Sequence, residues 1–254
     1  KEKGLLRNLG ASIRNLLSWD LNELKLQLQV LLHKKVDPFD SFNYLKNIQK
    51  RYDLRPVYFF LLADYGLNDK NISYQNRGFQ SLIKSIADYA DVGIHPSFGS
   101  NFKYNKLGDE VKRLERITKR DIHKSRQHFL KLHLPETYRR LVEVDIHEDY
   151  TMGFASELGF RAGAAFTYPF YDLDEEVELK LDVKPFMVMD ATLKYYLKVS
   201  KDEAMEKIKL IIDECKAVNG EFVSLWHNES LGDSPDWQGW KELFEKMNDY
   251  AIRA

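Results

Sequence analysis

The sequence predicts an α/β fold of about six parallel strands that alternate with helices and close into a barrel. Short apolar runs rich in β-branched and aromatic residues alternate along the chain with segments whose apolar residues recur at the helical period. No Pro-, Gly- or Ser-rich linker divides the 254 residues, and 44% hydrophobic residues suffice for a substantial core. We therefore expect one structural unit.

The strands and helices are placed by these patterns. The expected strands are 57–62, 91–94, 125–129, 149–154, 186–189 and 222–226. The helices expected between and after them have apolar faces within 79–86, 107–117, 135–142, 204–215 and 237–252. The acidic run 172–182 is expected to form a surface loop and an edge strand.

The N-terminal segment 1–54 reads as helix and is expected to pack on the barrel of residues 55–254. Leucines at the helical period predict two amphipathic helices within residues 1–32. Asp37 and Pro38 are typical of an N-cap followed by a first-turn proline, which predicts a helix to about Arg51. The segment has an excess of basic residues, so docking of these helices on a membrane surface or partner is an alternative to a plain solvated face.

Composition limits the kinds of partner and cofactor. With 38 basic and 39 acidic residues the net charge is −1, so we predict no nucleic-acid partner. Cys215 is the single cysteine, which leaves His and carboxylate side chains as metal ligands. No apolar run approaches the ~20 residues that span a bilayer, and no signal-peptide core is present. We expect no transmembrane segment and a cytoplasmic location.

Polar and titratable residues follow the predicted strands, at the ends where ligands bind in parallel α/β folds. They are Asp64, His95, Arg126, His128, Tyr150, Asp190 and His227. One such residue is more often a hydrogen-bonded structural group, but a succession of them predicts a functional site. The other histidines, at positions 33, 123, 133 and 147, are expected at the surface.

This residue set predicts metal-assisted hydrolysis. Neutral imidazole and carboxylate suit a borderline divalent cation such as zinc. An arginine can orient a carboxylate base, and a further histidine can protonate a leaving group. The sequence has no GxSxG elbow, phosphate loop or dinucleotide fingerprint, so those chemistries are not supported.

Four ordered segments, RPVYFFLL, DVGIHPSFGSN, SRQHFLK and FVSLWHN, resemble those of one enzyme family. In order and spacing they are similar to a barrel strand, a metal-binding His segment, an Arg-Pro-Pro-Tyr segment and a closing Leu-x-His segment of the NodB-homology polysaccharide deacetylases, more closely a divergent bacterial branch. The resemblance covers residues 55 to about 231. It implies an irregular (β/α) barrel, a carbohydrate substrate, and removal of an N-acyl group with a divalent metal, zinc or alternatively Co, Ni or Mn.

The resemblance also implies roles for individual residues. His95 would be a metal ligand, Arg126 would orient the catalytic base, and His227 would be the general acid. The family has a second His four residues after the first, where this chain has Gly99. His128 could supply that ligand from a neighbouring strand, and the alternative is that it is a structural ring.

The family's first motif, a strand with paired Asp that supplies a ligand and the base, should precede residue 55. The resemblance therefore makes the helical segment an insertion and places that first strand upstream of Lys1, leaving Asp64 as the best remaining catalytic carboxylate. Four residues, Arg161, Tyr150, Asp190 and Trp226, are expected to line sugar subsites. The alternative function is a catalytically degenerate, carbohydrate-binding barrel, which Gly99 favours.

Overall fold

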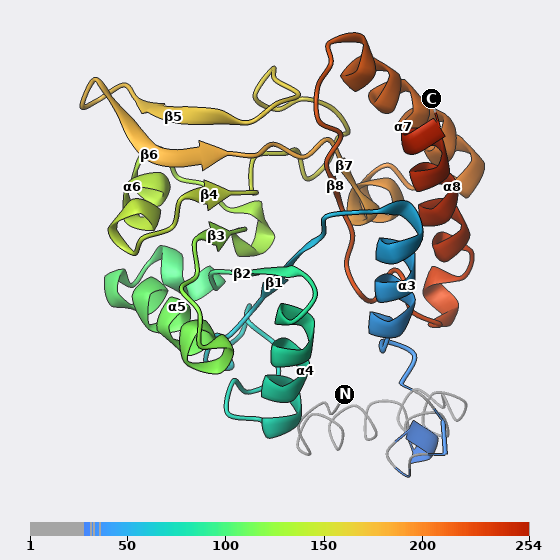
Figure 1. Cartoon of the computed structure of the whole chain (residues 1–254), viewed down its shortest axis with the longest axis horizontal. Helices are drawn as coiled ribbons and strands as arrows, with labels where there is room; N and C mark the ends of the chain where they lie inside the picture. The colour runs from blue at the N-terminus through green and yellow to red at the C-terminus, as the bar shows by residue number, and fades with distance from the viewer. Residues whose placement is uncertain (1–27, 31, 33, 36, 254) are drawn as a thin grey trace.

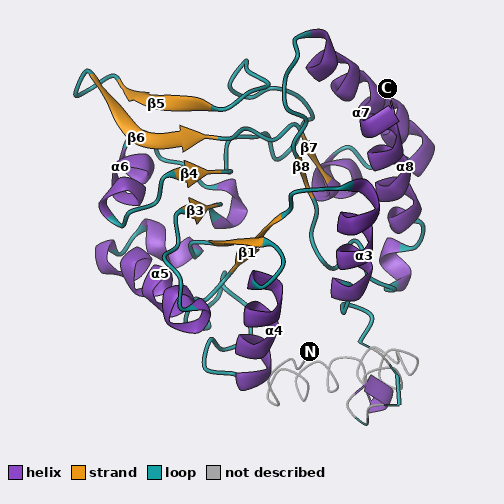
Figure 2. Ribbon diagram, viewed as in Figure 1, coloured by secondary structure: helices purple, strands orange, loops and turns teal. Residues whose placement is uncertain are grey.

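The computed structural model describes residues 28–253 except 31, 33 and 36, and its fold is α/β (Figures 1 and 2). A six-stranded sheet has the order β1-β2-β3-β4-β6-β5, and β7 and β8 form a separate pair. The strands are β1 Val57–Phe60, β2 Asp91–Ile94, β3 Lys124–Ser125, β4 Glu148–Asp149, β5 Tyr168–Asp172, β6 Val177–Val183, β7 Val188–Met189 and β8 Ser224–Leu225. All pairings are parallel except that of β5 with β6. The prediction of a mainly parallel α/β fold is confirmed.

Helices cover both sheets. They are α3 Phe42–Tyr52, α4 Arg77–Ala87, α5 Tyr104–Thr118, α6 Glu136–Glu143, α7 Lys201–Ala217 and α8 Trp240–Arg253. In Figure 1, α4, α5 and α6 lie beside the six-stranded sheet, whereas α3, α7 and α8 lie together on the side of β7 and β8. Short 3₁₀ turns follow two strands of the larger sheet, η1 Phe98–Asn101 after β2 and η2 His128–Leu130 after β3.

Each sheet has its own main apolar core. Leu62, Leu114 and Leu181 are buried in the core of the six-stranded sheet. Val188 and Ile208 are buried in the core that joins β7 to α3, α7 and α8. Full burial of one such side chain contributes roughly 1.5–3 kcal/mol, so both cores hold their strand ends in place.

The predicted helix after Asp37 begins later than expected. Asp37 caps a turn, since its Oδ1 accepts the N–H of Phe39 and its carbonyl accepts that of Asp40. The helix itself starts at Phe42. It packs on α8 through Ile48 and through the hydroxyl of Tyr44, which donates to the Lys241 carbonyl.

The acidic run is part of the sheet rather than only a loop and an edge. Residues 177–183 form β6, which pairs with β4 on one side and β5 on the other, so β5 is the outer strand. Toward the end of β6 the residues alternate between exposed and buried, and Leu181 and Val183 are buried in the core. The strands expected at 125–129 and 149–154 are shorter, because only two residues of each ladder pair.

The described strands do not close into a hydrogen-bonded barrel. β1 and β8 are the outer strands of their sheets and do not pair with each other. Both line one cavity, described below. The two helices predicted within residues 1–32 lie outside the described residues except 28–30, which are helical, and 32, which is in a turn. The strand expected upstream of Lys1 lies outside them too. No helix in the described part is long and apolar enough to cross a membrane.

Candidate functional site

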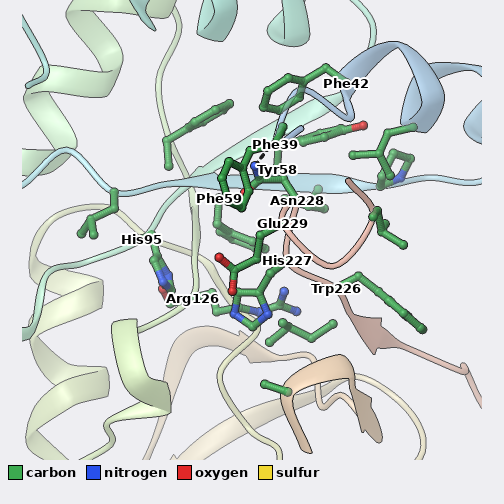
Figure 3. A pocket seen from close by; sticks show the side chains of 18 of the residues that line it. Phe39, Phe42, Tyr58, Phe59, His95, Arg126, Trp226, His227, Asn228 and Glu229 are labelled. Carbon is green, nitrogen blue, oxygen red and sulfur yellow. Dashed lines mark hydrogen bonds between the residues drawn. The ribbon is translucent and has the colours of Figure 1, made fainter. Parts of the chain in front are cut away.

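A cavity of about 2510 Å³ opens at the carboxyl ends of the strands and between β1 and β8 (Figure 3). Six of the predicted site residues line it: His95, Arg126, His128, Tyr150, Trp226 and His227. The other three, Asp64, Arg161 and Asp190, do not. The structure therefore brings together most of the side chains that follow the predicted strands.

His95 follows β2 directly and is fixed at both its backbone and its ring. Its N–H donates to the Phe60 carbonyl, and its Nδ1 lies 2.5 Å from the Arg126 carbonyl. A carbonyl can only accept, so Nδ1 bears the proton and Nε2 has a free lone pair. Burial is the largest cause, and electrostatic interactions with His128 and Arg126 add to it, so that the pKa of His95 is lowered to about 3. His95 is therefore a neutral imidazole at neutral pH.

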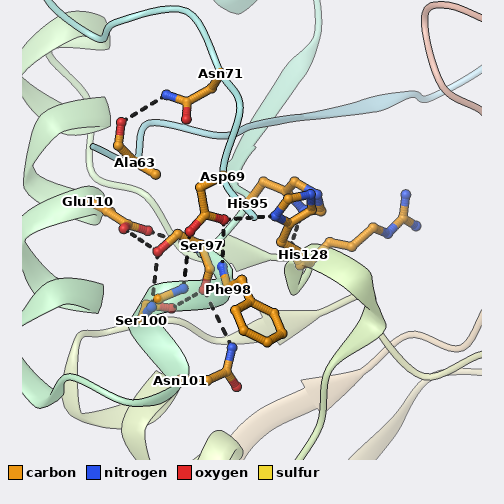
Figure 4. A network of polar contacts seen from close by, with 12 residues as sticks. Ala63, Asp69, Asn71, His95, Ser97, Phe98, Ser100, Asn101, Glu110 and His128 are labelled. Atoms are coloured by element: carbon orange, nitrogen blue, oxygen red, sulfur yellow. Dashed lines mark hydrogen bonds and ion pairs between the residues drawn. The ribbon is translucent and has the colours of Figure 1, made fainter. Parts of the chain in front are cut away.

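His128 lies beside His95, with the ring centroids 5.1 Å apart (Figure 4). The turn η2 places it there, since the His128 N–H donates to the Pro96 carbonyl next to His95. Nδ1 of His128 lies 2.9 Å from Oδ1 of Asp69. Its Nε2 is thus the ring nitrogen left for a ligand. The two rings are therefore neighbours, and their role as metal ligands stays a prediction.

Asp69 is a carboxylate of the candidate site that the sequence reasoning missed. It lies buried in the loop after β1 and also accepts the backbone N–H groups of Phe98 and Gly99. Burial alone would raise its pKa, but the hydrogen bonds from His128 and the two amides outweigh it and lower the pKa. The only sequence signal was its position in a polar loop after an apolar strand.

Asp64 is not placed as a catalytic carboxylate. It does not line the cavity, and its Oδ1 lies 2.9 Å from Nη2 of Arg113 on α5. The carboxylate that contacts a site histidine belongs instead to Asp69, five residues later in the loop after β1. Asp64 is therefore an exposed ion-pair partner of Arg113 rather than the catalytic carboxylate that the sequence suggested.

The two imidazoles fit part of a metal site. A metal-ligating His commonly donates its other ring N–H to a carbonyl or carboxylate, and here Arg126 and Asp69 supply those acceptors. Within the described residues, no His, Cys or carboxylate completes a three-ligand group with them. At the position of the family's second histidine, the backbone N–H of Gly99 donates a hydrogen bond to Asp69. This part of the chain thus offers two ligands.

His227, after β8, is paired with a buried carboxylate. Its Nδ1 lies 2.7 Å from Oδ1 of Asp190, and its N–H donates to Oδ2 at 2.7 Å. Burial would lower the pKa of His227, but the charge and hydrogen bond of Asp190 outweigh this and raise it. Asp190 is completely buried, so the expectation that it contacts sugar is wrong. It positions His227.

Glu229 is a second carboxylate that the sequence reasoning missed. It is exposed, lines the cavity and lies beside the His227 ring in Figure 3. Its charge contributes to the raised pKa of His227. The sequence signal was weak, because Glu229 stands in a loop two residues beyond the predicted site histidine.

Arg126 crosses the floor of the cavity. Its Nε donates to the Tyr150 carbonyl, and its guanidinium lies 4.8 Å from the centre of the Phe59 ring and 5.6 Å from that of Phe186. Burial lowers its pKa to about 10, so it is charged at neutral pH. In the described part of the chain it has no ion pair with a carboxylate, and its role as an orienter stays a prediction.

The remaining predicted sugar contacts differ in position. Tyr150 and Trp226 line the cavity, with the Tyr150 hydroxyl donating to Glu148 and the Trp226 ring packed 4.9 Å from that of Phe244. Arg161 does not line it and donates to the Gly153 carbonyl instead. Arg161 is therefore not placed to contact a ligand in this cavity.

A second group of potential ligands lies at the opposite ends of two strands. His123 precedes β3, His147 precedes β4, and their ligand atoms and that of Asp145 lie within 4.8 Å of one another. The two rings stack 4.7 Å apart, and Asp145 and His147 are exposed. This group is compatible with a divalent metal but is separate from the cavity.

Comparison with known proteins gives a fold similarity and no sequence family. A crystal structure from Mycobacterium smegmatis, provisionally assigned as a polysaccharide deacetylase, matches 97% of this chain and 80% of its own, with a TM-score of 0.62 and 12% identity. This chain shares that fold. A Bordetella bronchiseptica structure, provisionally assigned as a polysaccharide deacetylase involved in O-antigen biosynthesis, matches 83% of this chain and 76% of its own with a TM-score of 0.41 and 10% identity. No family model and no curated protein sequence matches.

Proposed function

We propose that this protein is a metal-dependent hydrolase that removes an N-acyl group, such as acetyl, from an amino sugar in a glycan. The observation that carries the proposal is the set of three histidines on one cavity, each with Nδ1 held by an oxygen acceptor. Their Nε2 atoms are left for chemistry. The fold shared with a provisionally assigned polysaccharide deacetylase supports the choice of substrate class.

His95 and His128 would hold the metal. Their Nδ1 contacts fix the ring orientations, and the low pKa of His95 means that no proton competes for its Nε2 at neutral pH. A divalent ion such as zinc, when bound, polarises an acyl carbonyl and lowers the pKa of a water. Within the described residues, these two histidines are the protein ligands available in the cavity.

His227 would act as the general acid. Asp190 holds the imidazole by Nδ1, so Nε2–H faces the cavity and can protonate the amide nitrogen as the C–N bond breaks. The products are then the free amine and the carboxylic acid. The raised pKa keeps more of His227 protonated near neutral pH, as an acid requires.

Glu229 is the best-placed described carboxylate to take a proton from the attacking water. It lines the cavity and lies close enough to His227 for its charge to act on that ring. Arg126 contributes fixed positive charge deeper in the cavity.

The alternative function, glycan binding without turnover, rests on one specific observation. Gly99 replaces the histidine that the resemblance implies, and the described residues supply two metal ligands. A barrel that has lost full ligation would bind a glycan in the same cavity and leave its acyl group in place.

The deciding experiment measures acetate and free amine released from N-acetylated oligosaccharides, with added zinc and after chelation. We expect metal-dependent release that falls by about 10²-fold or more in His227→Gln. His133→Ala serves as the control, because His133 is exposed and pairs with Glu136 away from the cavity. Glycan binding without any release would favour the degenerate protein. The absence of both binding and release would refute both functions.

A further inference from the structure

An exposed group of aromatic rings begins at the candidate site and extends outward from it. Phe98, Phe102 and Phe129 form this aromatic platform. The Phe98 ring lies 5.8 Å from that of Phe129 and 5.4 Å from that of Phe102. Phe129 is 61% exposed and Phe102 is 68% exposed. Adjacent exposed aromatic rings of this kind commonly mark a binding surface.

The backbone that presents Phe129 is in an unfavourable conformation. Phe129 has φ 59° and ψ 19°, and the next residue, Leu130, has φ 51°. A left-handed conformation costs a non-glycine residue roughly 1–2 kcal/mol. The chain thus adopts two such residues in succession while leaving a phenyl ring in solvent. Strain of this type concentrates at functional sites.

The platform is joined to the candidate metal ligands. The Phe129 ring lies against the His128 ring, 4.2 Å away and inclined by 30°, while 61% of the residue stays exposed. Oδ1 of Asp69 accepts hydrogen bonds from Nδ1–H of His128 and from the backbone N–H of Phe98 (Figure 4). One buried carboxylate therefore fixes the imidazole and the start of the platform relative to each other.

The platform continues beyond the cavity. Phe129 lines the cavity, whereas Phe98 and Phe102 do not. The Nζ of Lys131 lies 4.5 Å from the centre of the Phe98 ring and 3.9 Å from that of Phe102. The Phe98 ring is inclined by 87° to that of Phe129 and by 58° to that of Phe102, so a ligand that reaches from the cavity to Phe102 meets rings of different orientation and a cation with donors to spare.

We propose that this aromatic platform is a glycan subsite that stacks the sugars next to the one whose acyl group enters the cavity. The apolar C–H face of a pyranose ring matches an open phenyl face, and Lys131 can donate to ring substituents. Two ring-to-ring steps make the platform longer than one pyranose, so the preferred ligand is an oligosaccharide or polysaccharide chain. This inference rests on the proposed function for its ligand class.

The test compares binding of an N-acetylglucosamine tetramer and the monosaccharide by calorimetry in the presence of chelator. We expect the tetramer to bind more tightly. We expect Phe102→Ala and Phe129→Ala each to weaken tetramer binding about five- to tenfold, and Phe129→Tyr, which keeps the ring, to restore it. Phe166→Ala is the matched control, because Phe166 is 56% exposed and does not line the cavity. Far-ultraviolet circular dichroism and thermal unfolding check that each variant folds.

The outcomes separate the platform from the proposed hydrolysis. Tetramer affinity that is unchanged in both alanine variants, or absent in the wild-type protein, overturns the platform even if acetate release is measured. Platform-dependent binding without acetate release upholds the platform and refutes the hydrolase. Weakening by Phe166→Ala to the same degree would also overturn the proposal, since any exposed ring would then serve.

Discussion

The buried carboxylate of Asp190 holds His227 twice, through ring atom Nδ1 and through the backbone N–H, both at 2.7 Å. These bonds fix the ring orientation and set which nitrogen faces the cavity. A group this deeply buried cannot contact a glycan itself, so it acts through the histidine.

Asp190→Asn should therefore reduce turnover while leaving substrate binding largely intact. The amide cannot supply the negative charge that stabilises imidazolium, so the pKa of His227 should fall. We expect acetate release to fall by about 10²-fold or more. Nuclear magnetic resonance titration of His227 measures the pKa, and a pKa equal to that of the wild type would contradict the assigned role.

The pH dependence of activity follows from the raised pKa of His227. A general acid must be protonated, so turnover should decline as the pH rises through this pKa, and His227→Gln should lose that limb of the profile. The folded pKa is raised above the unfolded value of about 6.5, so the associated stability is present below that pH. It is lost as the pH rises through the folded pKa. Urea unfolding of both proteins across this pH range measures the difference.

Metal binding should depend on the cavity histidines and on Asp69. We expect His95→Ala or His128→Ala to abolish zinc binding in the cavity, and Asp69→Asn to weaken it about 10- to 100-fold by releasing the His128 ring. Calorimetry with zinc gives affinity and stoichiometry. The matched control is His123→Ala, which alters the separate ligand group. Loss of the metal in that variant alone would place the ion at the far ends of the strands.

Core packing on α7 gives a stability prediction with an internal control. Ile208 is completely buried, whereas Leu210 on the same helix is 67% exposed. Ile208→Ala should lower the free energy of unfolding by about 2–5 kcal/mol because it leaves a cavity. Leu210→Ala should change it by less than about 0.5 kcal/mol. Equal effects in urea denaturation would contradict the packing described for this core.

The sequence predicted the parts of the fold that depend on local pattern. The continuous apolar run 57–62 located β1, the short segment 91–94 located β2, and amphipathic periodicity located α4, α5 and α7. The ladders after Ser125 and Asp149 were predicted too long, because apolar pattern does not reveal where hydrogen-bonded pairing stops. The β5–β6 hairpin was only partly anticipated, because its acidic composition resembles that of a surface loop.

The candidate site was predictable where it depends on strand order. His95 and His128 follow neighbouring parallel strands, so their approach follows from topology. Asp69 and Glu229 lie in loops, whose paths the sequence pattern does not define. Asp190 was located correctly but given the wrong role, since its complete burial depends on packing around β7 and β8.

The outer positions of β1 and β8 have a consequence for the behaviour of the protein in solution. Each presents strand hydrogen-bonding groups that no other described strand takes up. Such groups act as templates for intermolecular β-pairing, and natural sheets shield them to avoid aggregation. Both edges border the cavity, so in solution only an extended segment that enters the cavity could pair with them.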